Sequence, residues 1–320
     1  MSYEIKSIFE LSKGNKEKIK IDWLVKDLIS KKNPTIIYGD GGSYKSLIAL
    51  HLGMVVQEGL PFSNLPTQET NVLLLALEGV EDVVPRAVAH WDEYGMPEED
   101  CFDISRGPFE FGNEEHEKEL SEVIKENKIG LLIIDTLSLA TVGDISTGTT
   151  SGIITRQLRR MCDSLNLTII LIAHTGKNAD RGIKGASEFF NNVPTVIHVH
   201  DNSISVKKQR SALPIPTLRF SVLPKVINDE EQTSICLVWD HDELNPRLVS
   251  ILDQLDKKPE GMPRKELFNY VYERHGFKKT KENVRKQFDR DLENLKKTSK
   301  IVDVLFSEDR KDIGYKRVNS

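Results

Sequence analysis

Apolar runs that end in polar residues recur along the first half of the chain. They occupy residues 36–38, 71–77, 129–134 and 168–173. Segments of helical spacing follow residue 46 and recur at residues 81–94, 115–127 and 153–165. Such runs are typical of strands that are buried on both faces of a parallel sheet. Their alternation with helical segments predicts an α/β fold with a mainly parallel, twisted sheet.

The pattern changes on either side of this region. Residues 21–25 begin a predicted helix that ends before Asn33 and Pro34. Short strands are predicted at residues 195–200, 203–208, 218–223 and 234–239. Helices are predicted at residues 248–255, 263–271 and 280–297, and a hairpin at residues 301–306 and 314–318. Three helices and a hairpin resemble a winged helix.

A glycine-rich turn follows the first apolar run and opens into a helix. The turn and the helix start consist of Gly39, Asp40, Gly41, Gly42, Ser43, Tyr44, Lys45, Ser46 and Leu47. Glycines let backbone N–H groups curl round an anion, and the N–H groups at a helix start favour phosphate. Lys45 is predicted to bind the β- and γ-phosphates of ATP, and the Ser46 hydroxyl to bind Mg2+. The alternative is a glycine-rich turn without a ligand.

One position departs from the usual phosphate-loop pattern, G-x-x-x-x-G-K-[ST]. The residue before the lysine is Tyr44 instead of glycine, although Gly39, Lys45 and Ser46 keep the expected spacing. The Tyr44 ring is free to point outward and to stack on a base or on a neighbouring side chain.

Two apolar runs end in carboxylates. Glu78 follows residues 71–77, and Asp135 ends the run at residues 129–134. Because ligands of open α/β sheets lie at the carboxyl ends of the strands, both side chains are expected beside the nucleotide. Asp135 is predicted to hold Mg2+ together with Ser46, and Glu78 to polarise the attacking water. Alone, Glu78 also fits a carboxylate at a helix start.

Polar residues follow the next strand. His174 is predicted to contact the γ-phosphate, or alternatively to be a strand-end histidine bonded to the backbone. The glycine-containing loop after it carries Lys177, Arg181 and Lys184, which suit contacts with nucleic-acid phosphates. Residues 143–152 are predicted to form a mobile loop that contacts a substrate, or an ordinary surface loop.

Two cations lie two residues apart on a later strand. Lys208 and Arg210 therefore share one face of it, and the alternative role for such lysines is to protect an edge strand from aggregation. His198, His200 and Asp201 together suggest a metal, but no further ligand is evident.

Composition narrows the class of protein. With 320 residues, 38% of them hydrophobic and 29% charged, the chain suits a soluble protein of one large domain, or of one large and one small domain. No apolar run approaches the roughly 20 residues of a membrane span. Residues 1–20 are too polar for a secretory signal. Three scattered cysteines indicate reduced thiols and a cytoplasmic location.

Charge is unevenly distributed. Residues 250–320 contain 18 Lys or Arg against 13 Asp or Glu, whereas residues 1–249 contain 26 against 36. The last predicted helix carries Lys281, Arg285 and Arg290 opposite its apolar face. A basic face of this kind predicts contact with a DNA groove, and a protein-docking module is the alternative.

These motifs resemble those of RecA-like P-loop ATPases, and among them the hexameric replicative helicases of the RepA type, which plasmids and phages carry. The resemblance covers about residues 20–240, through residues 21–25, 39–46, Glu78, 134–136, 174–177 and 181–187. Residues 208–210 are similar to the strand by which DnaB-type helicases insert a lysine and an arginine finger into the next subunit. The resemblance implies catalytic roles for Lys45, Glu78, Asp135, His174, Lys208 and Arg210, with ATP and Mg2+ bound.

The function implied is that of a hexameric helicase or translocase on single-stranded DNA, with a primase or initiator protein as a further partner. Three alternatives remain: an ATPase that loads or regulates another protein, a DNA-binding regulator assembled by ATP, and a recombinase-like filament. The predicted units are an N-terminal segment packed on the core (1–34), an ATPase domain (35–240), a linker (241–249) and a winged helix (250–320).

Overall fold

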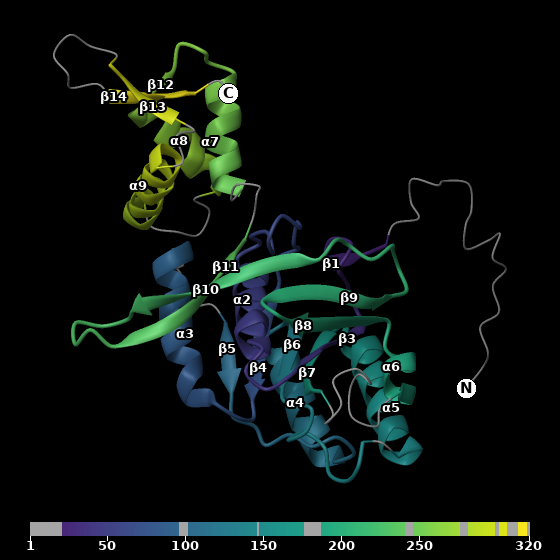
Figure 1. Ribbon diagram of the computed structural model, residues 1–320. Helices are drawn as coiled ribbons and strands as arrows, with labels where there is room; N and C mark the ends of the chain where they lie inside the picture. Colours follow the sequence, from purple (N-terminus) through teal and green to yellow (C-terminus); the bar gives the residue numbers. More distant parts are fainter. Residues whose placement is uncertain are drawn as a thin grey trace, which may run out of the picture.

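A nine-stranded sheet forms the centre of the larger part of the molecule (Figure 1). The structure is a computed structural model that describes residues 21–95, 102–145, 147–175, 187–240, 246–275, 281–297, 301–305 and 313–318. The strand order is β11-β10-β9-β8-β3-β7-β6-β4-β5. The strand that precedes the glycine-rich turn, β3 (Pro34–Gly39), therefore lies in the middle of the sheet.

Six neighbouring strands of this sheet are parallel, and four of them, β3, β4, β6 and β7, lie at the predicted apolar runs. Besides β3, the six are β4 (Asn71–Ala76), β5 (Asp103–Ser105), β6 (Ile129–Asp135), β7 (Thr168–His174) and β8 (Thr195–His200). Three antiparallel strands continue the sheet: β9 (Ser203–Gln209), β10 (Leu218–Val226) and β11 (Thr233–Trp239).

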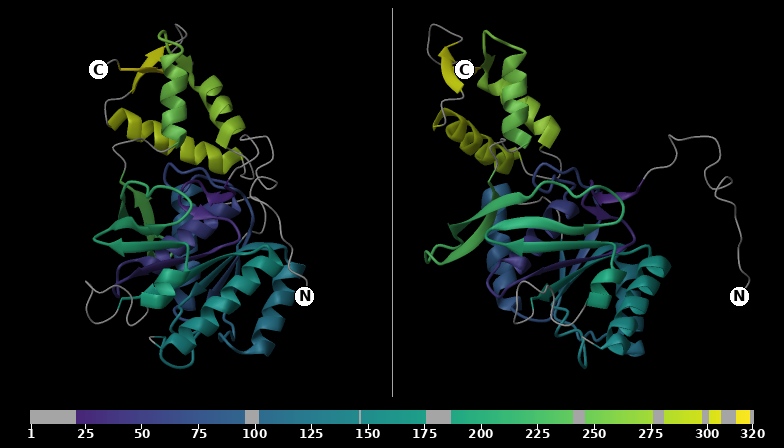
Figure 2. Two further views of the ribbon diagram at one scale, coloured as in Figure 1. Left: turned by 90° about the vertical axis from the view of Figure 1, so that its right-hand side faces the viewer. Right: turned by 45° about the vertical axis from the view of Figure 1, so that its right-hand side comes forward.

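Helices cover both faces of the sheet (Figures 1 and 2). One face carries α2 (Lys45–Gln57) and α3 (Val80–Tyr94), and the other carries α4 (Glu114–Glu126), α5 (Gly148–Leu165) and α6 (Ser187–Asn192). Alternate residues of a strand enter different clusters, since Ile133 packs with Leu52 of α2 whereas Ile134 packs with Leu158 of α5. Burial on both faces explains why these strands are continuously apolar.

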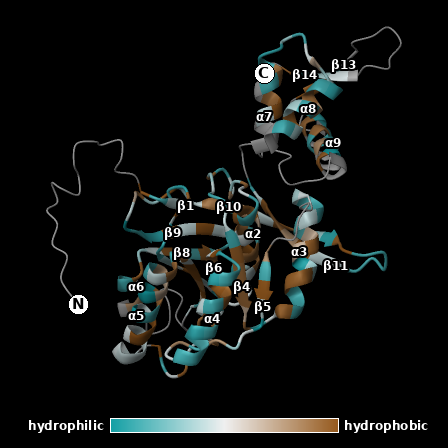
Figure 3. Cartoon of the chain, turned by 180° about the vertical axis from the view of Figure 1, so that it is seen from behind, coloured by the Kyte–Doolittle hydropathy of each residue, from teal (hydrophilic) through white to brown (hydrophobic). Residues whose placement is uncertain are grey.

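Seen from behind, β4 is mostly apolar whereas the outer surface of α4 is polar (Figure 3). This helix begins because the Asn113 side chain accepts hydrogen bonds from the backbone N–H groups of Glu115 and His116. Only Leu120 and Ile124 of α4 are buried against the sheet.

The prediction of a helix that begins at residue 21 is wrong. Residues Trp23–Val25 (β1) and Ile29–Ser30 (β2) instead form a two-stranded hairpin. The buried positions Leu24, Val25, Leu28 and Ile29 fit one face of a helix equally well, which explains the error. Asp27, with φ of 61°, makes a left-handed turn that interrupts any helix there.

The loop predicted at residues 143–152 is shorter than expected, because α5 begins at Gly148 instead of residue 153. Thr147 caps the helix by accepting a hydrogen bond from the N–H of Thr150 at 3.2 Å. Glycine, serine and threonine favour loops, but here the cap and the buried side chain of Ser151 support a helical turn.

The C-terminal residues form a smaller unit with its own core. It consists of α7 (Pro246–Asp256), β12 (Met262–Pro263), α8 (Arg264–His275), α9 (Lys281–Lys297), β13 (Ile301–Leu305) and β14 (Ile313–Arg317). Leu252, Leu267, Phe288 and Ile301 pack in one cluster that contains no residue of the large sheet. The three predicted helices and the hairpin are present, and α7 starts inside the segment predicted as a linker. The winged-helix assignment stays a prediction.

Candidate nucleotide site

The phosphate loop joins the end of β3 to the start of α2. At Gly39 an added Cβ would lie 2.3 Å from the carbonyl oxygen of Val199, so only glycine fits. Gly42 has a φ of 77°, which glycine adopts without strain. Tyr44, with φ of 67° and ψ of 22°, is also left-handed and directly precedes Lys45. The loop thus makes the predicted turn, with Tyr44 in a conformation suited to the usual glycine.

Lys45 is buried at the first position of α2. Its Nζ donates to the carbonyl oxygen of Asp40 at 2.6 Å and to Oγ of Ser43 at 3.4 Å. Burial lowers the pKa of Lys45, and the neighbouring carboxylates of Asp135, Asp40 and Glu78 oppose that shift. The ammonium group is therefore held within the loop, next to the N-terminal end of the α2 dipole.

Asp135 lies at the end of β6 and is only 6% exposed. The Ser46 hydroxyl hydrogen-bonds to its side chain, whereas its Oδ1 has no hydrogen-bond partner. Burial raises the pKa of Asp135, and the Ser46 hydrogen bond works in the opposite direction. Both residues line a cavity of about 250 Å³ together with Glu78. A buried carboxylate oxygen without a partner beside a hydroxyl is a donor set that suits Mg2+.

Glu78 and His174 meet at the same edge of the sheet. Glu78 Oε1 lies 3.6 Å from Nε2 of His174, and both side chains are about half exposed. The strand order explains this proximity, because β7 lies between β3 and β6 and pairs Gly39 with His174. The structure therefore brings together the predicted carboxylates, the histidine and the phosphate loop at the carboxyl ends of neighbouring strands.

Comparison with known proteins assigns the chain to a family. A model described as an AAA domain matches residues 3–180, which is more than half of the chain. The chain belongs to this AAA domain family. The family, the phosphate loop and the mostly parallel sheet together identify a RecA-like P-loop ATPase core.

Other comparisons add little. No curated protein matches this AAA protein. Among solved structures, a KaiC-like protein from the hyperthermophilic archaeon Pyrococcus horikoshii OT3 is similar, with a TM-score of 0.42 and 13% identity. That match covers 67% of this chain and 93% of the other, and it is too distant to carry any argument. Within the ranges that the structure describes, every helix is too short or too polar to cross a bilayer.

The AAA domain has site residues that the sequence did not single out. Thr175 donates from its N–H to the carbonyl oxygen of Gly39 at 3.1 Å and from its hydroxyl to Asp40. It ties the end of β7 to the phosphate loop, and the sequence had indicated it only as a member of the segment 174–177, without a role of its own. Asp82 and Arg86 of α3 line the cavity of Ser46 and Asp135, and their carboxylate and guanidinium groups lie 2.9 Å apart. Asp82 lies four residues after Glu78 and Arg86 four residues after Asp82, which was a weak signal for this placement.

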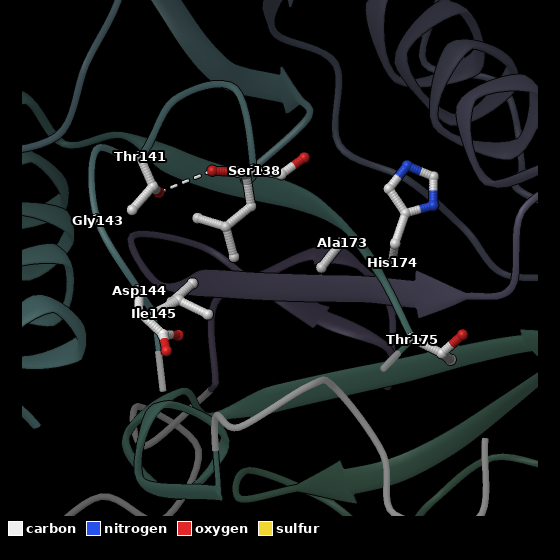
Figure 4. Close-up of a pocket in the computed structure, with 9 residues that line it drawn as sticks. Ser138, Thr141, Gly143, Asp144, Ile145, Ala173, His174 and Thr175 are labelled. Carbon is white, nitrogen blue, oxygen red and sulfur yellow. Dashed lines mark hydrogen bonds between the residues drawn. The ribbon is translucent and has the colours of Figure 1, made fainter. Parts of the chain in front are cut away.

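A second cavity, of about 440 Å³, opens beside the nucleotide site of the AAA domain (Figure 4). It lies between the ends of β6 and β7, and its lining includes Leu137, Ser138, Asp144, Ile145, His174 and Thr175. Figure 4 shows the His174 and Thr175 side chains on different sides of the strand end. The loop predicted to contact a substrate therefore does border the nucleotide site.

Lys208 and Arg210 converge on one atom away from this site. Lys208 Nζ donates to the carbonyl oxygen of Asn191 at 2.8 Å, and Arg210 donates to the same oxygen. Burial and the charge of Arg210 lower the pKa of Lys208. The two cations therefore share one face of the chain, as predicted.

The structure describes only some of the residues that were predicted to contact nucleic acid. Lys177, Arg181 and Lys184 lie outside the described residues, and Lys281 and Arg290 are described only as positions in α9. Arg285 of α9 is exposed, and its guanidinium lies 5.6 Å from the centre of the Phe268 ring. His198 stacks on Tyr38 and on His200, and the described residues contain no metal-binding group of three or more His, Cys, Asp or Glu.

Proposed function

We propose that this AAA protein assembles into a ring in which each subunit completes the ATP site of the next. The resemblance to hexameric helicases implies six subunits. The ring would move along single-stranded DNA as a helicase or translocase, in the replication of a plasmid, phage or mobile element. The observation that carries the proposal is the position of Lys208 and Arg210 at the end of β9.

Strand register separates this cation pair from its own phosphate loop. Lys208 pairs with Val196 of β8, and Val196 pairs with Ile36 of β3. Gly39 lies three residues beyond Ile36 and two strands away from Lys208. At about 3.3 Å per residue and 4.8 Å per strand, the Cα atoms of Lys208 and Gly39 are roughly 14 Å apart. The pair is therefore far from its own site, which supports a role in the site of another subunit.

Within one site, the residues divide the chemistry of ATP hydrolysis. Lys45 and the backbone N–H groups of the loop bind phosphate oxygens. Ser46 and Asp135 would hold Mg2+, which neutralises charge on the β- and γ-phosphates when bound. Glu78 would accept a proton from the attacking water, and His174 would contact the γ-phosphate.

Lys208 and Arg210 of one subunit would complete the ATP site of its neighbour. On assembly, Lys208 and Arg210 would exchange the neutral carbonyl of Asn191 for the phosphate anion of the neighbour, which is a stronger hydrogen-bond acceptor. An arginine finger accelerates phosphoryl transfer by about 10³–10⁵-fold. Hydrolysis should therefore depend on self-association.

Subunit mixing tests this arrangement. Lys45→Ala subunits should turn over no ATP but still offer Arg210, whereas Arg210→Ala subunits bind ATP but offer no finger. Neither variant alone should hydrolyse ATP at the parent rate, and a mixture should regain part of the activity. A mixture that regains none would contradict action in trans. A Glu78→Gln variant, which should bind ATP without hydrolysing it, serves as the control for the chemical step.

The helicase role needs its own measurement. ATP turnover should rise with protein concentration and with added single-stranded DNA, and the protein should displace an annealed strand. Turnover that responds to DNA without strand displacement would favour an ATPase that loads or regulates a partner. Filaments in place of rings under the electron microscope would favour a recombinase-like assembly.

A further inference from the structure

Leu213 is the most exposed large apolar side chain among the residues that the structure describes. Its exposed fraction is 88%, and Pro214 beside it is exposed as well. Both lie in the loop between β9 and β10, where prolines at 214 and 216 fix their own backbone and favour an extended conformation in the residues before them. The loop therefore presents an apolar side chain to water in a restricted conformation, and burial against a partner would remove the cost of its hydration.

Contacts before and after Leu213 hold this loop on the core. Gln209 Nε2 donates to the carbonyl oxygen of Leu28 at 2.9 Å, and its Oε1 accepts from the N–H of Ser211 at 3.2 Å. On the other side of Leu213, Ile215 packs against the hydrophobic cluster that contains Leu28. A side chain that is held in place before it binds loses little conformational entropy on binding, which suits Leu213 to recognition.

The cavity of about 440 Å³ at the ends of β6 and β7 suits an apolar side chain (Figure 4). Leu137 and Ala173 are buried in the core cluster that Ile145 packs against, and all three line the cavity. Val142, which lies in the same loop as Ile145, is 69% exposed. An apolar cavity next to an exposed valine is typical of a surface that another protein covers.

Leu213 and this cavity lie on different sides of one subunit. Strand β9 ends at the amino ends of the parallel strands, because Lys208 pairs with Val196 near the start of the antiparallel neighbour β8. The cavity lies at the carboxyl ends, and three strand spacings, about 14 Å, separate β7 from β9. Leu213 therefore reaches such a cavity in a second copy of the chain. Contacts between different surfaces of identical subunits generate rings when the rotation closes.

Charge favours the same contact. The cations of Lys208 and Arg210 precede Leu213 in the chain and lie together on one carbonyl oxygen. Carboxylates border the cavity, since Asp144 lines it and Glu78 lies 3.6 Å from the histidine that the cavity shares with the nucleotide site. Opposite charges of this kind guide two surfaces into one orientation and disfavour others.

We propose that Leu213 of one subunit inserts into this cavity of the next copy. Leu213 lies three residues beyond Arg210, a separation that an extended chain spans in about 10 Å. In the accepting subunit His174 belongs to both the nucleotide site and the cavity, so Arg210 at the γ-phosphate would bring Leu213 over the cavity. The inference rests on the proposed action of the cations in trans, and it adds the apolar contact that fastens their loop to the neighbour.

The protein concentration needed for assembly is the first measurement. Sedimentation velocity with Mg2+ and a non-hydrolysable ATP analogue should show that Leu213→Asp raises this concentration about tenfold, because a carboxylate does not enter an apolar cavity. Leu213→Met keeps the apolar volume and should assemble like the parent. Val226→Asp is the matched control, since Val226 is a 59% exposed apolar residue at the far end of β10 and its substitution should leave assembly unchanged.

Cross-linking between two preparations identifies the partner site. One carries Leu213→Cys and the other Ile145→Cys, and both carry Cys101→Ser, while the two remaining cysteines are buried. At a protein concentration at which both assemble, a short bis-maleimide should join the two preparations to each other. A Val226→Cys preparation should not be joined to the Ile145→Cys preparation.

The leucine contact would be overturned by a Leu213→Asp variant that assembles like the parent, by an equal loss of assembly in Val226→Asp, or by the absence of the expected cross-link. Any of these results, together with activity regained in the mixture of Lys45→Ala and Arg210→Ala subunits, would remove the leucine contact and leave the action in trans standing. A parent protein that does not assemble at any concentration would overturn both.

Discussion

Tyr44 keeps a glycine-like backbone conformation at a position where its Cβ costs free energy. Two substitutions that both remove the ring isolate this cost. Tyr44→Ala retains a Cβ at φ of 67°, and Tyr44→Gly does not. We expect the alanine variant to be less stable than the glycine variant by about 1 kcal/mol, because the left-handed strain exceeds the lower chain entropy of unfolded alanine. Urea unfolding of the two variants side by side measures the difference, and equal midpoints would show that the loop relaxes around alanine.

His51 is a buried histidine whose proton state is set by its neighbours. It accepts from Trp239 at Nε2, so the proton of the neutral ring lies on Nδ1 and is donated to Nδ1 of His90 at 3.2 Å. Tyr94 packs against the same ring. Burial lowers the pKa of His51 from 6.5 to about 3, so the ring stays neutral in the folded protein at ordinary pH.

This shift predicts a loss of stability in acid. Between pH 6.5 and pH 3 the unfolded chain is protonated at His51 and the folded chain is not. The free energy of unfolding therefore falls as the pH is lowered through this range. At pH 5, which is 1.5 units below the unfolded pKa of 6.5, protonation of His51 in the unfolded chain lowers the free energy of unfolding by about 2 kcal/mol. His51→Gln, whose amide can replace both hydrogen bonds, should lose less stability than the parent between pH 7 and pH 5. Urea unfolding at the two values measures the difference, and identical losses would contradict the assignment.

At the scale of whole elements, α3 is fastened to the β10–β11 hairpin by Lys225. Its Nζ lies 2.6 Å from Glu93 and 3.2 Å from Asp92 at the last turn of α3. Carboxylates at a helix C-terminus oppose the helix dipole, and α3 has no basic residue of its own in that turn. Burial acts to lower the pKa of Lys225, but the hydrogen bonds and charges of Glu93 and Asp92 outweigh it, so the pKa is raised.

Removing this cation should loosen the hairpin from the helix. For Lys225→Met, which keeps the length of the side chain, we expect a loss of about 1–2 kcal/mol of unfolding free energy. Hydrogen bonds to charged groups contribute about 1.5–3 kcal/mol, and partial exposure of the carboxylates reduces that value. Lys225→Arg keeps the charge and should lose less. Hydrogen exchange of β10 and β11 should rise in the methionine variant, and an unchanged exchange rate would show that packing alone holds the hairpin.

Elements differ in how far sequence could predict them, for physical reasons. Strands such as β6 and β7 were found because burial on both faces leaves an unbroken apolar run. The hairpin of β1 and β2 was missed because buried pairs at 24, 25, 28 and 29 fit two periodicities. Gly39, Lys45 and Asp135 were found by local spacing. The contact of Thr175 with the loop was not, because it depends on the order of strands in the sheet, and Asp82 and Arg86 were not, because only the packing of α3 brings them to the site.

At the scale of the molecule, the ATPase core and the C-terminal unit have separate hydrophobic clusters. The clusters of the core contain residues from Leu24 to Leu237, and that of the C-terminal unit contains residues from Ile251 to Tyr315. Since no described residue of one unit is buried in a cluster of the other, the core is expected to fold without residues 246–320. The basic excess of residues 250–320 then predicts what the truncated protein loses.

Truncation after Asp240 should leave ATP hydrolysis intact while weakening binding to duplex DNA or to a partner protein. Fluorescence anisotropy with a labelled duplex distinguishes these partners, because binding through Lys and Arg to DNA phosphates weakens steeply as salt rises. Arg285→Ala in the full chain is the matched control, since Arg285 is an exposed cation of α9 whose loss should reduce the salt dependence without unfolding the unit. A truncated protein that binds duplex as tightly as the full chain would assign DNA binding to the core. A full chain that binds no duplex at any salt concentration would leave the C-terminal unit as a protein-docking module.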